Sequence, residues 1–307
     1  MRIAIVGAGG VGGYFGGAMA HAGHDVILLA RGEHRDAIRS RGLEVREPEG
    51  AWTAGVGATD DPAELPPADL ALVAVKSYSL TEVAPAVRKL AEAGAMVLPL
   101  LNGVETFESL ATLGVPPDRM LAGLTVISVE RTAPGVITRK SPFRSVVVGE
   151  RRGGSSERAE RVAALFRESG ADARVSEDIA LDLWRKFLFL TTLAAACGLA
   201  RASIGPVRDA PQGGFLLQRA AREIAAVARA RGVAIPAGEE EQVLERMAAL
   251  PAGTKPSFLL DLERGGPNEL DVLSGAVSRY GRESGVATPV HDTAVAAFSA
   301  SAAAGSR

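Results

Sequence analysis

The chain has 307 residues, 47% hydrophobic and 23% charged, which is enough for two domains with cores of their own. A formal net charge of -2 provides no basic field for a polyanion, so it argues against nucleic acid and anionic membrane surfaces as partners and favours a small molecule. The single cysteine, Cys197, cannot form an internal disulfide and stands in an apolar run, which fits a buried residue and a reducing cytoplasm.

In the first half of the chain, short apolar runs alternate with helical patterns. This alternation, with runs that are apolar at every position such as "LALVAV", predicts a parallel sheet with helices on both faces. The expected strands are Arg2–Val6, Asp25–Ala30, Leu70–Val75, Met96–Leu101, Met120–Val129 and Asp172–Val175. Residues 42–58 predict a short inserted hairpin, and residues 135–150 predict another hairpin near the end of the sheet.

From residue 177 onward the pattern is helical, with no convincing strand. The expected helices are Asp178–Ala200, Gly213–Arg231, Gly238–Leu250, Glu269–Ser284 and a last one from Thr288 to the end, where residues 299–307 are expected to fray. We therefore predict a Rossmann-type, doubly wound α/β domain over residues 1–176 and an all-α domain over residues 177–307. No membrane segment is expected, because the apolar run Phe187–Leu199 is shorter than the ~20 residues that span a bilayer.

The stretch "VGAGGVGG" directly follows the first expected strand and opens a helical pattern. Gly7, Gly9 and Gly12 have the spacing G-x-G-x-x-G, and the loop also contains Ala8, Gly10 and Val11. The first glycine permits a tight turn, the second lets the backbone approach a pyrophosphate, and the third lets helix and strand pack closely. Glycines four apart give this helix a slim face for packing against the sheet or the second domain. A glycine-rich turn without a ligand is the alternative, but it gives no reason for so many helix-weakening glycines.

The end of the second strand bears on the choice of dinucleotide. NAD-binding sites place an acidic residue there, to accept a hydrogen bond from the ribose 2′-hydroxyl. Here the strand ends in Arg31, which could pair with a 2′-phosphate, so NADP(H) is favoured over NAD(H). The alternative, NAD(H), stays open because Glu33 lies nearby and because Arg31 could be a solvated surface residue.

Lys76 and Asn102 each follow an apolar strand. Ligands of open α/β sheets lie beyond the carboxyl ends of the strands, so both side chains are expected to line the cofactor crevice. A surface lysine and a turn asparagine are the alternatives.

Three residues of the helical half are further candidates. Lys186 stands between Trp184 and Phe187, either as a lysine at the helix edge with its amine in water or as a partly buried general acid. Ser257 and Glu269 begin helical segments, where helix capping and a favourable interaction with the helix dipole are the alternatives to a role in the site. We found no His/Cys cluster for a metal ion, and no metal is expected.

These motifs together resemble the ketopantoate reductase family, whose members reduce 2-dehydropantoate with NADPH. The resemblance is carried by "GAGGVG", Arg31, Lys76, "LLNGVE", "LWRKFLF" and "SFLLDLERGGPNELDVLSGAV", in the family's order over nearly the whole chain. It implies a C-terminal domain like that of 6-phosphogluconate dehydrogenase, cytoplasmic location and a place in pantothenate biosynthesis. A homodimer is left open.

The resemblance also implies a role for each candidate. Lys186 would be the general acid and Glu269 its catalytic partner, while Asn102 and Ser257 would bind substrate. Gly7, Ala8, Gly9, Gly10, Val11, Gly12, Arg31, Lys76 and Asn102 would contact NADPH.

The chain departs from the family one and two turns after the lysine. Leu190 and Ala194 stand where the best-known members carry substrate-binding asparagines. Two alternatives to 2-dehydropantoate reduction are therefore kept. One is a reductase of the same fold that acts on a different 2-keto or imino acid, and the other is an NADPH-binding sensor without catalysis.

Overall fold

The structure is a computed structural model that describes residues 1–305, with side chains up to residue 300. The chain forms two compact units: residues 1–101 with 106–179, and residues 102–105 with the chain from Ala180 onward. A short segment of the first half thus belongs to the helical unit. Part of the tail expected to fray, residues 306 and 307, lies outside the described residues.

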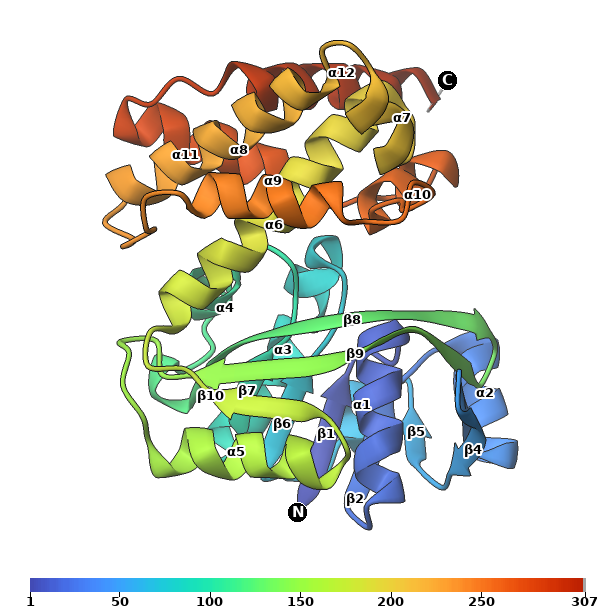
Figure 1. The fold of residues 1–307 in the computed structure, drawn as a ribbon. Helices are drawn as coiled ribbons and strands as arrows, with labels where there is room; N and C mark the ends of the chain where they lie inside the picture. The colour runs from blue at the N-terminus through green and yellow to red at the C-terminus, as the bar shows by residue number, and fades with distance from the viewer. Residues whose placement is uncertain (306–307) are drawn as a thin grey trace. The chain divides into compact units, whose positions relative to one another are not determined.

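The first unit contains a five-stranded parallel sheet with the order β5-β2-β1-β6-β7 (Figure 1). Its strands are β1 (Arg2–Val6), β2 (Asp25–Leu29), β5 (Gly57–Thr59), β6 (Leu70–Val73) and β7 (Met96–Pro99). This order reverses between β1 and β6, the point at which doubly wound sheets bind ligands. The predicted doubly wound α/β class is therefore confirmed for this unit.

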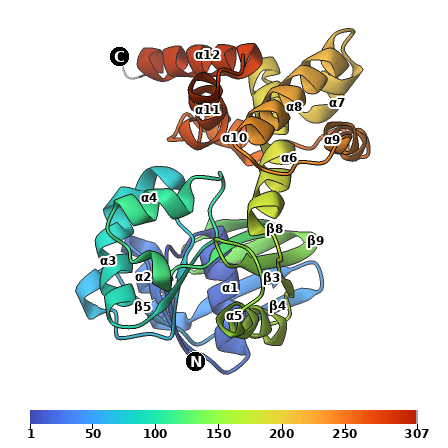
Figure 2. The same cartoon turned by 90° about the vertical axis from the view of Figure 1, so that its left-hand side faces the viewer.

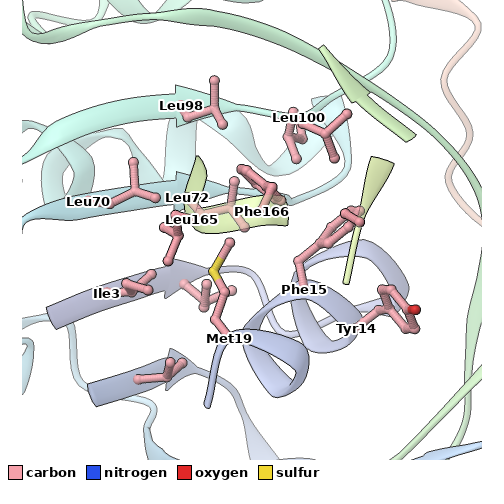
Figure 3. Packing of buried hydrophobic residues seen from close by; sticks show 14 of the residues in the cluster. Ile3, Tyr14, Phe15, Met19, Leu70, Leu72, Leu98, Leu100, Leu165 and Phe166 are labelled. Atoms are coloured by element: carbon pink, nitrogen blue, oxygen red, sulfur yellow. The ribbon is translucent and has the colours of Figure 1, made fainter. Parts of the chain in front are cut away.

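Helices cover both faces of this sheet because its central strands carry apolar residues at successive positions, as Ile3–Val6 and Leu70–Val73 do. Ile3 and Ile5 of β1 pack with α1 (Gly10–His21) and α5 (Glu157–Glu168), whereas Ala4 and Val6 pack with α3 (Leu80–Glu92) and α4 (Thr106–Thr112). Figure 2 shows α3 and α1 on opposite sides of the strands. Met19 and Phe15 of α1 point toward the leucines of the sheet, and Phe15 meets Phe166 of α5 edge to face at 5.1 Å (Figure 3).

The strands expected at Met120–Val129 and Asp172–Val175 form, but they lie in a second, mixed sheet and not in the parallel one. In this second sheet the strand order is β10-β9-β3-β4, and β8 pairs with β9. Its strands are β3 (Leu43–Glu47), β4 (Gly50–Ala54), β8 (Ala122–Ala133), β9 (Val136–Gly149) and β10 (Asp172–Val175). The hairpin predicted at residues 42–58 is confirmed as β3 and β4, which pair antiparallel, but Gly57 and Ala58 belong to β5 of the parallel sheet instead.

The hairpin predicted within residues 135–150 is wrong. These residues form one strand, β9, which pairs antiparallel with β8. Ser141 and Pro142, in the middle of this strand, lie where the register shifts between the pairs Ile127–Arg144 and Val129–Arg139. A proline is tolerated in a strand at such a bulge, because no ladder hydrogen bond is needed from its nitrogen.

Helix α1 lies between the two sheets, and its glycines allow both to come close. A Cβ on Gly16 would lie 2.9 Å from Ile5 of β1, and one on Gly13 would lie 2.8 Å from Ile137 of β9. Gly17 faces Leu43 and Val45 of β3. The slim face predicted for this helix therefore packs against a second sheet of the same unit, in addition to the first.

The second unit is all-helical in the part of the chain that the structure describes, as predicted. Its helices are α6 (Ile179–Ala200), α7 (Ile204–Asp209), α8 (Gly213–Ala230), α9 (Glu239–Ala248), α10 (Ser257–Glu263), α11 (Ala276–Ser284) and α12 (Pro289–Gly305), with a π-helical turn, η4, at Asp271–Gly275. One core lies among these helices and includes Cys197, which is fully buried. Burial raises the pKa of this thiol to about 11, so Cys197 is an inert core residue.

Helix α6 is long and apolar enough to cross a membrane, but 61% of its most apolar window is buried within the protein. The central helix of a folded domain has the same composition, so this is weak evidence for a membrane span.

Candidate active site

The glycine-rich loop joins β1 to α1. Gly7 has φ +106°, a conformation that favours glycine, and a Cβ there would lie 2.6 Å from Val75 beyond the end of β6. A Cβ on Gly12 would lie 2.0 Å from the carbonyl oxygen of Gly7. A Cβ on Gly9, in contrast, would have no atom of the described residues within 4 Å apart from its neighbours in the chain. The first and third glycines of the motif are thus required by packing, whereas the second faces open space.

The first turn of α1 offers its backbone amides to that space. Gly9 is the N-cap residue, and having no side chain it leaves the initial N–H groups without a side-chain partner. A helix N-terminus whose N-cap residue supplies no side-chain acceptor fits a phosphate group. The loop therefore suits a dinucleotide pyrophosphate.

His34 supports this loop and was missed in the sequence analysis. It belongs to α2 (Gly32–Arg41), is 4% exposed, and its Nε2 is 2.8 Å from the carbonyl oxygen of Ala8. The backbone N–H of Gly135 donates to its Nδ1 at 2.8 Å, which fixes Nε2 as the protonated nitrogen. Burial lowers the pKa of His34, so the ring stays neutral and holds the loop. A histidine in the helix after the second strand was the only signal in the sequence.

Arg31 and Lys76 lie beyond the ends of their strands, as expected. Arg31 is exposed and forms an ion pair of 2.6 Å with Glu82 of α3. Lys76 is partly buried and precedes a 3-10 turn (η2, Ser77–Ser79), with its carbonyl oxygen accepting from the N–H of Ser79 at 2.9 Å. Their contacts with a cofactor remain predictions.

In the second unit, three of the candidate residues come together. The Lys186 ammonium donates to Asn102 Oδ1 at 3.2 Å, and Asn102 Nδ2 donates to Glu269 Oε2 at 3.1 Å. The orientation of the amide follows from its partners, since an ammonium group cannot accept and a carboxylate cannot donate. One neutral side chain therefore joins the amine to the carboxylate.

Two opposing effects act on the Lys186 amine. Burial lowers its pKa to about 8, and the negative charge of Glu269 acts in the opposite direction. Adjacent Arg185 pairs instead with Glu239 of α9 at 2.9 Å. The geometry thus favours a partly buried amine over a lysine whose amine extends into water.

Glu269 and Ser257, the remaining candidates from the helical half, differ in burial. Glu269 is 3% exposed and accepts a hydrogen bond from Asn102. A carboxylate that only interacted with the helix dipole would need neither burial nor this hydrogen bond. Ser257 is exposed, and the N-cap of α10 is Pro256 rather than Ser257. Capping is therefore not the role of Ser257, and substrate binding by it remains a prediction.

A search for metal-binding groups gave no cluster of three His, Cys, Asp or Glu side chains among the described residues. The polar groups gathered at Lys186 are instead an amine, an amide and a carboxylate. This set suits proton transfer to an oxygen atom.

Two families of known proteins match the sequence. Residues 3–153 match the family described as ketopantoate reductase PanE/ApbA, and residues 178–302 match that described as the C-terminal part of the same enzyme. The chain belongs to the ketopantoate reductase family. It is similar to 2-dehydropantoate 2-reductase of Halobacterium salinarum, with 35% identity over 94% of this chain and 95% of the relative. It is therefore an oxidoreductase of the 2-dehydropantoate 2-reductase type.

Solved structures agree with this assignment. A ketopantoate reductase of the PanE/ApbA family from Ralstonia eutropha covers all of both chains, with 29% identity and a TM-score of 0.91. The ternary structure of D-mandelate dehydrogenase with NADH and anilino(oxo)acetate also covers all of both chains, with 24% identity and a TM-score of 0.90. That second likeness is one of fold alone, so the ketopantoate reductase fold does not by itself determine the substrate.

Proposed function

We propose that the protein reduces a 2-keto acid to a 2-hydroxy acid with NADPH, and that this reaction is the reduction of 2-dehydropantoate to (R)-pantoate in pantothenate biosynthesis. The observation that carries the proposal is the Lys186 ammonium, held by Asn102 next to Glu269 in a family of oxidoreductases. The predicted division, with cofactor binding in residues 1–176 and substrate binding and catalysis in residues 177–307, is part of the proposal.

Lys186 acts as the general acid in this scheme. Bound NADPH supplies the hydride for the carbonyl carbon. The ammonium group contacts the carbonyl oxygen, stabilises the negative charge that develops there and donates its proton. Asn102 keeps the amine in place, and Glu269 favours its charged form before proton transfer. Ser257 and Asn102 bind the substrate.

The cofactor is held by the first unit. Backbone amides of Gly10, Val11 and Gly12 receive the pyrophosphate, Gly7, Ala8 and Gly9 shape the loop, and Lys76 contacts NADPH. Arg31 binds the 2′-phosphate, because its guanidinium has N–H groups left after one of them bonds Glu82.

Replacing Arg31 tests the cofactor assignment. Arg31→Glu should raise the dissociation constant for NADPH by about tenfold or more, because a charge-assisted bond is replaced by repulsion, and should leave that for NADH nearly unchanged. Fluorescence titration of both nucleotides measures this. Equal weakening of both would contradict a 2′-phosphate contact.

A second candidate function has a specific observation in its favour. Leu190 is partly buried, and Ala194, buried, follows one turn later on the Lys186 side of α6. Neither can hydrogen-bond a substrate hydroxyl, and a site lacking such bonds does not select strongly for that hydroxyl. The alternative substrate is a 2-keto or imino acid with a less polar substituent.

Turnover with a panel of substrates decides between these functions. NADPH oxidation is measured with 2-dehydropantoate, 2-oxoisovalerate, phenylglyoxylate and an imino acid, using wild type and Lys186→Ala. We expect the highest kcat/KM for 2-dehydropantoate and a loss of at least about 100-fold in Lys186→Ala. Preference for an apolar keto acid would establish the second candidate. Tight NADPH binding without any turnover would instead establish a sensor.

Cytoplasmic location and a homodimer complete the proposal. The composition, with a single buried cysteine, supports a reducing compartment. Sedimentation of the purified protein measures its oligomeric state.

A further inference from the structure

The segment Asn102–Glu105 leaves the first unit and becomes part of the second. Gly103 has φ +96°, and a Cβ there would lie 3.2 Å from the carbonyl oxygen of Val272 in the π-helical turn. Val104 packs against the core of the helical unit. The backbone of the segment thus lies directly against the turn that follows Glu269.

Beyond Gly103 and Val104, an ion-pair network holds the segment. Arg279 of α11 donates to Glu105 Oε2 at 2.6 Å and to Asp271 Oδ1 at 2.7 Å. The Glu105 side chain is 17% exposed, and that of Arg279 is 36% exposed. These carboxylates raise the pKa of Arg279 against the effect of burial, so the guanidinium is permanently charged.

The two partners of Arg279 are close in sequence to the residues of the site. Glu105 is three residues after Asn102, and Asp271 is two residues after Glu269. The guanidinium therefore ties the segment that carries the amide to the turn next to the carboxylate. An Arg that bonds two carboxylates at once fixes their separation, because the N–H groups of its planar fork have fixed directions.

We propose that Arg279 and Glu105 are positioning residues that hold the Asn102 amide between Lys186 and Glu269. The proposal rests on the proposed function, since Lys186 must be the proton donor for this placement to affect turnover. The sequence analysis gave neither residue a role, although Glu105 ends the motif "LLNGVE". A misplacement of about 1 Å at a reacting group is enough to slow catalysis strongly.

Two variants that each remove one charge of the ion pair, Glu105→Gln and Arg279→Gln, test the proposal. Each should lower kcat about tenfold and also raise KM for the keto acid, because Asn102 both holds the Lys186 amine and contacts the substrate in the proposed function. The matched control is Glu240→Gln, because Arg229 and Glu240 of the same unit form an ion pair of 2.6 Å with side chains 39% and 10% exposed. The control should retain wild-type kcat, and a loss equal to that in Glu105→Gln would overturn the proposal.

A second measurement needs neither cofactor nor turnover. The rate at which Lys186 is acetylated by acetic anhydride, followed by mass spectrometry across pH, reports the midpoint of its titration in the protein alone. Both variants should lower this midpoint, because a displaced Asn102 no longer accepts a hydrogen bond from the ammonium. A purely electrostatic effect would lower it in Glu105→Gln but raise it in Arg279→Gln, and that result would overturn the proposal.

Asn102→Ala and Lys186→Ala complete the design. If the ion pair acts through Asn102, adding Glu105→Gln to Asn102→Ala should cause no further loss of kcat. Full additivity would contradict the proposal. If Lys186→Ala itself retains activity, the proposed function fails instead, so the two failures are distinguishable.

Discussion

Lys186 is both buried and hydrogen-bonded. It is buried enough for its pKa to fall to about 8, and it keeps a hydrogen-bond acceptor, Asn102, that favours its charged form. A general acid works best when its pKa lies near the working pH, because it is then both protonated and ready to lose the proton. The residue can therefore donate its proton near neutral pH and recover it from solvent.

The pH dependence follows with opposite sign in the two directions of the reaction. Keto acid reduction needs the protonated amine, so log kcat/KM should be flat below pH 8 and fall above it. Hydroxy acid oxidation needs the neutral amine, so its log kcat/KM should rise up to pH 8 and then level off. Initial rates in both directions between pH 6 and about 10 measure this. If the change in log kcat/KM near pH 8 persisted in Lys186→Ala, a group other than Lys186 would be responsible for it.

At the scale of elements, α1 packs against strands of both sheets of the first unit. It lies between two sheets, and its glycines face strands of both. Helix propensity alone would disfavour such a sequence by ~1 kcal/mol for each glycine, so the close packing of helix and strands must offset that cost. The same element presents its first amides to the open space beside Gly9. Packing and phosphate binding are thus separate tasks of different glycines.

Alanine substitutions should separate these two tasks. Gly12→Ala should lower the melting temperature of the protein, because the new Cβ would overlap the carbonyl oxygen of Gly7. Gly9→Ala should leave the melting temperature within about 2 °C of the wild-type value, since φ there is -73° and no described atom beyond its chain neighbours lies within 4 Å of the new Cβ. The same variant should weaken NADPH binding by about tenfold or more, because the Cβ occupies the space for the pyrophosphate. Thermal unfolding and nucleotide titration measure the pair. Wild-type NADPH affinity in Gly9→Ala would contradict the assignment of the loop.

At the scale of the whole molecule, stability should depend on one histidine of the helical unit. His291 is fully buried, with Nε2 3.1 Å from the carbonyl oxygen of Ala220 and Nδ1 3.1 Å from Ser274 Oγ. Burial lowers its pKa from 6.5 to about 4, against the raising effects of its hydrogen bond to Ala220 and the charge of Asp292. Glu223 lies beside it and accepts from its backbone N–H at 3.2 Å.

Acid should therefore destabilise the protein through His291. Between pH 6.5 and 4 the unfolded chain binds a proton at this position that the folded protein does not, so stability falls as the pH is lowered. The full effect is about 3 kcal/mol. His291→Gln cannot titrate, so its unfolding free energy should depend less on pH across this window than that of wild type, as measured by chemical denaturation. Glu223, whose pKa is raised by burial, contributes with the opposite sign in both proteins and largely cancels in the comparison. Equal slopes would contradict the prediction.

Much of the fold was encoded locally and could be predicted. Apolar runs of strand length, the change of period near residue 177 and the glycines after β1 each reflect an interaction between near neighbours in sequence. Four predicted strands of the parallel sheet, in residues 2–6, 25–30, 70–75 and 96–101, were confirmed to within a few residues, as were the long helices of the second half. The other two predicted strands formed in the second sheet, because the partner of a strand depends on the packing of distant segments. At residues 135–150 the sequence did not distinguish a hairpin from one long strand, because Ser141 and Pro142 are compatible with a turn and with a bulge.

Tertiary structure alone decided how the candidate residues meet. Asn102 bonds residues 84 and 167 positions away along the chain, and His34 reaches Gly135 across 101 positions. Such contacts depend on which elements pack together, and no local pattern records that. The sequence by itself thus determined the classes of the two units and the residue types available for chemistry. Packing decided that the segment 102–105 joins the helical unit and that Asn102 lies between an amine and a carboxylate.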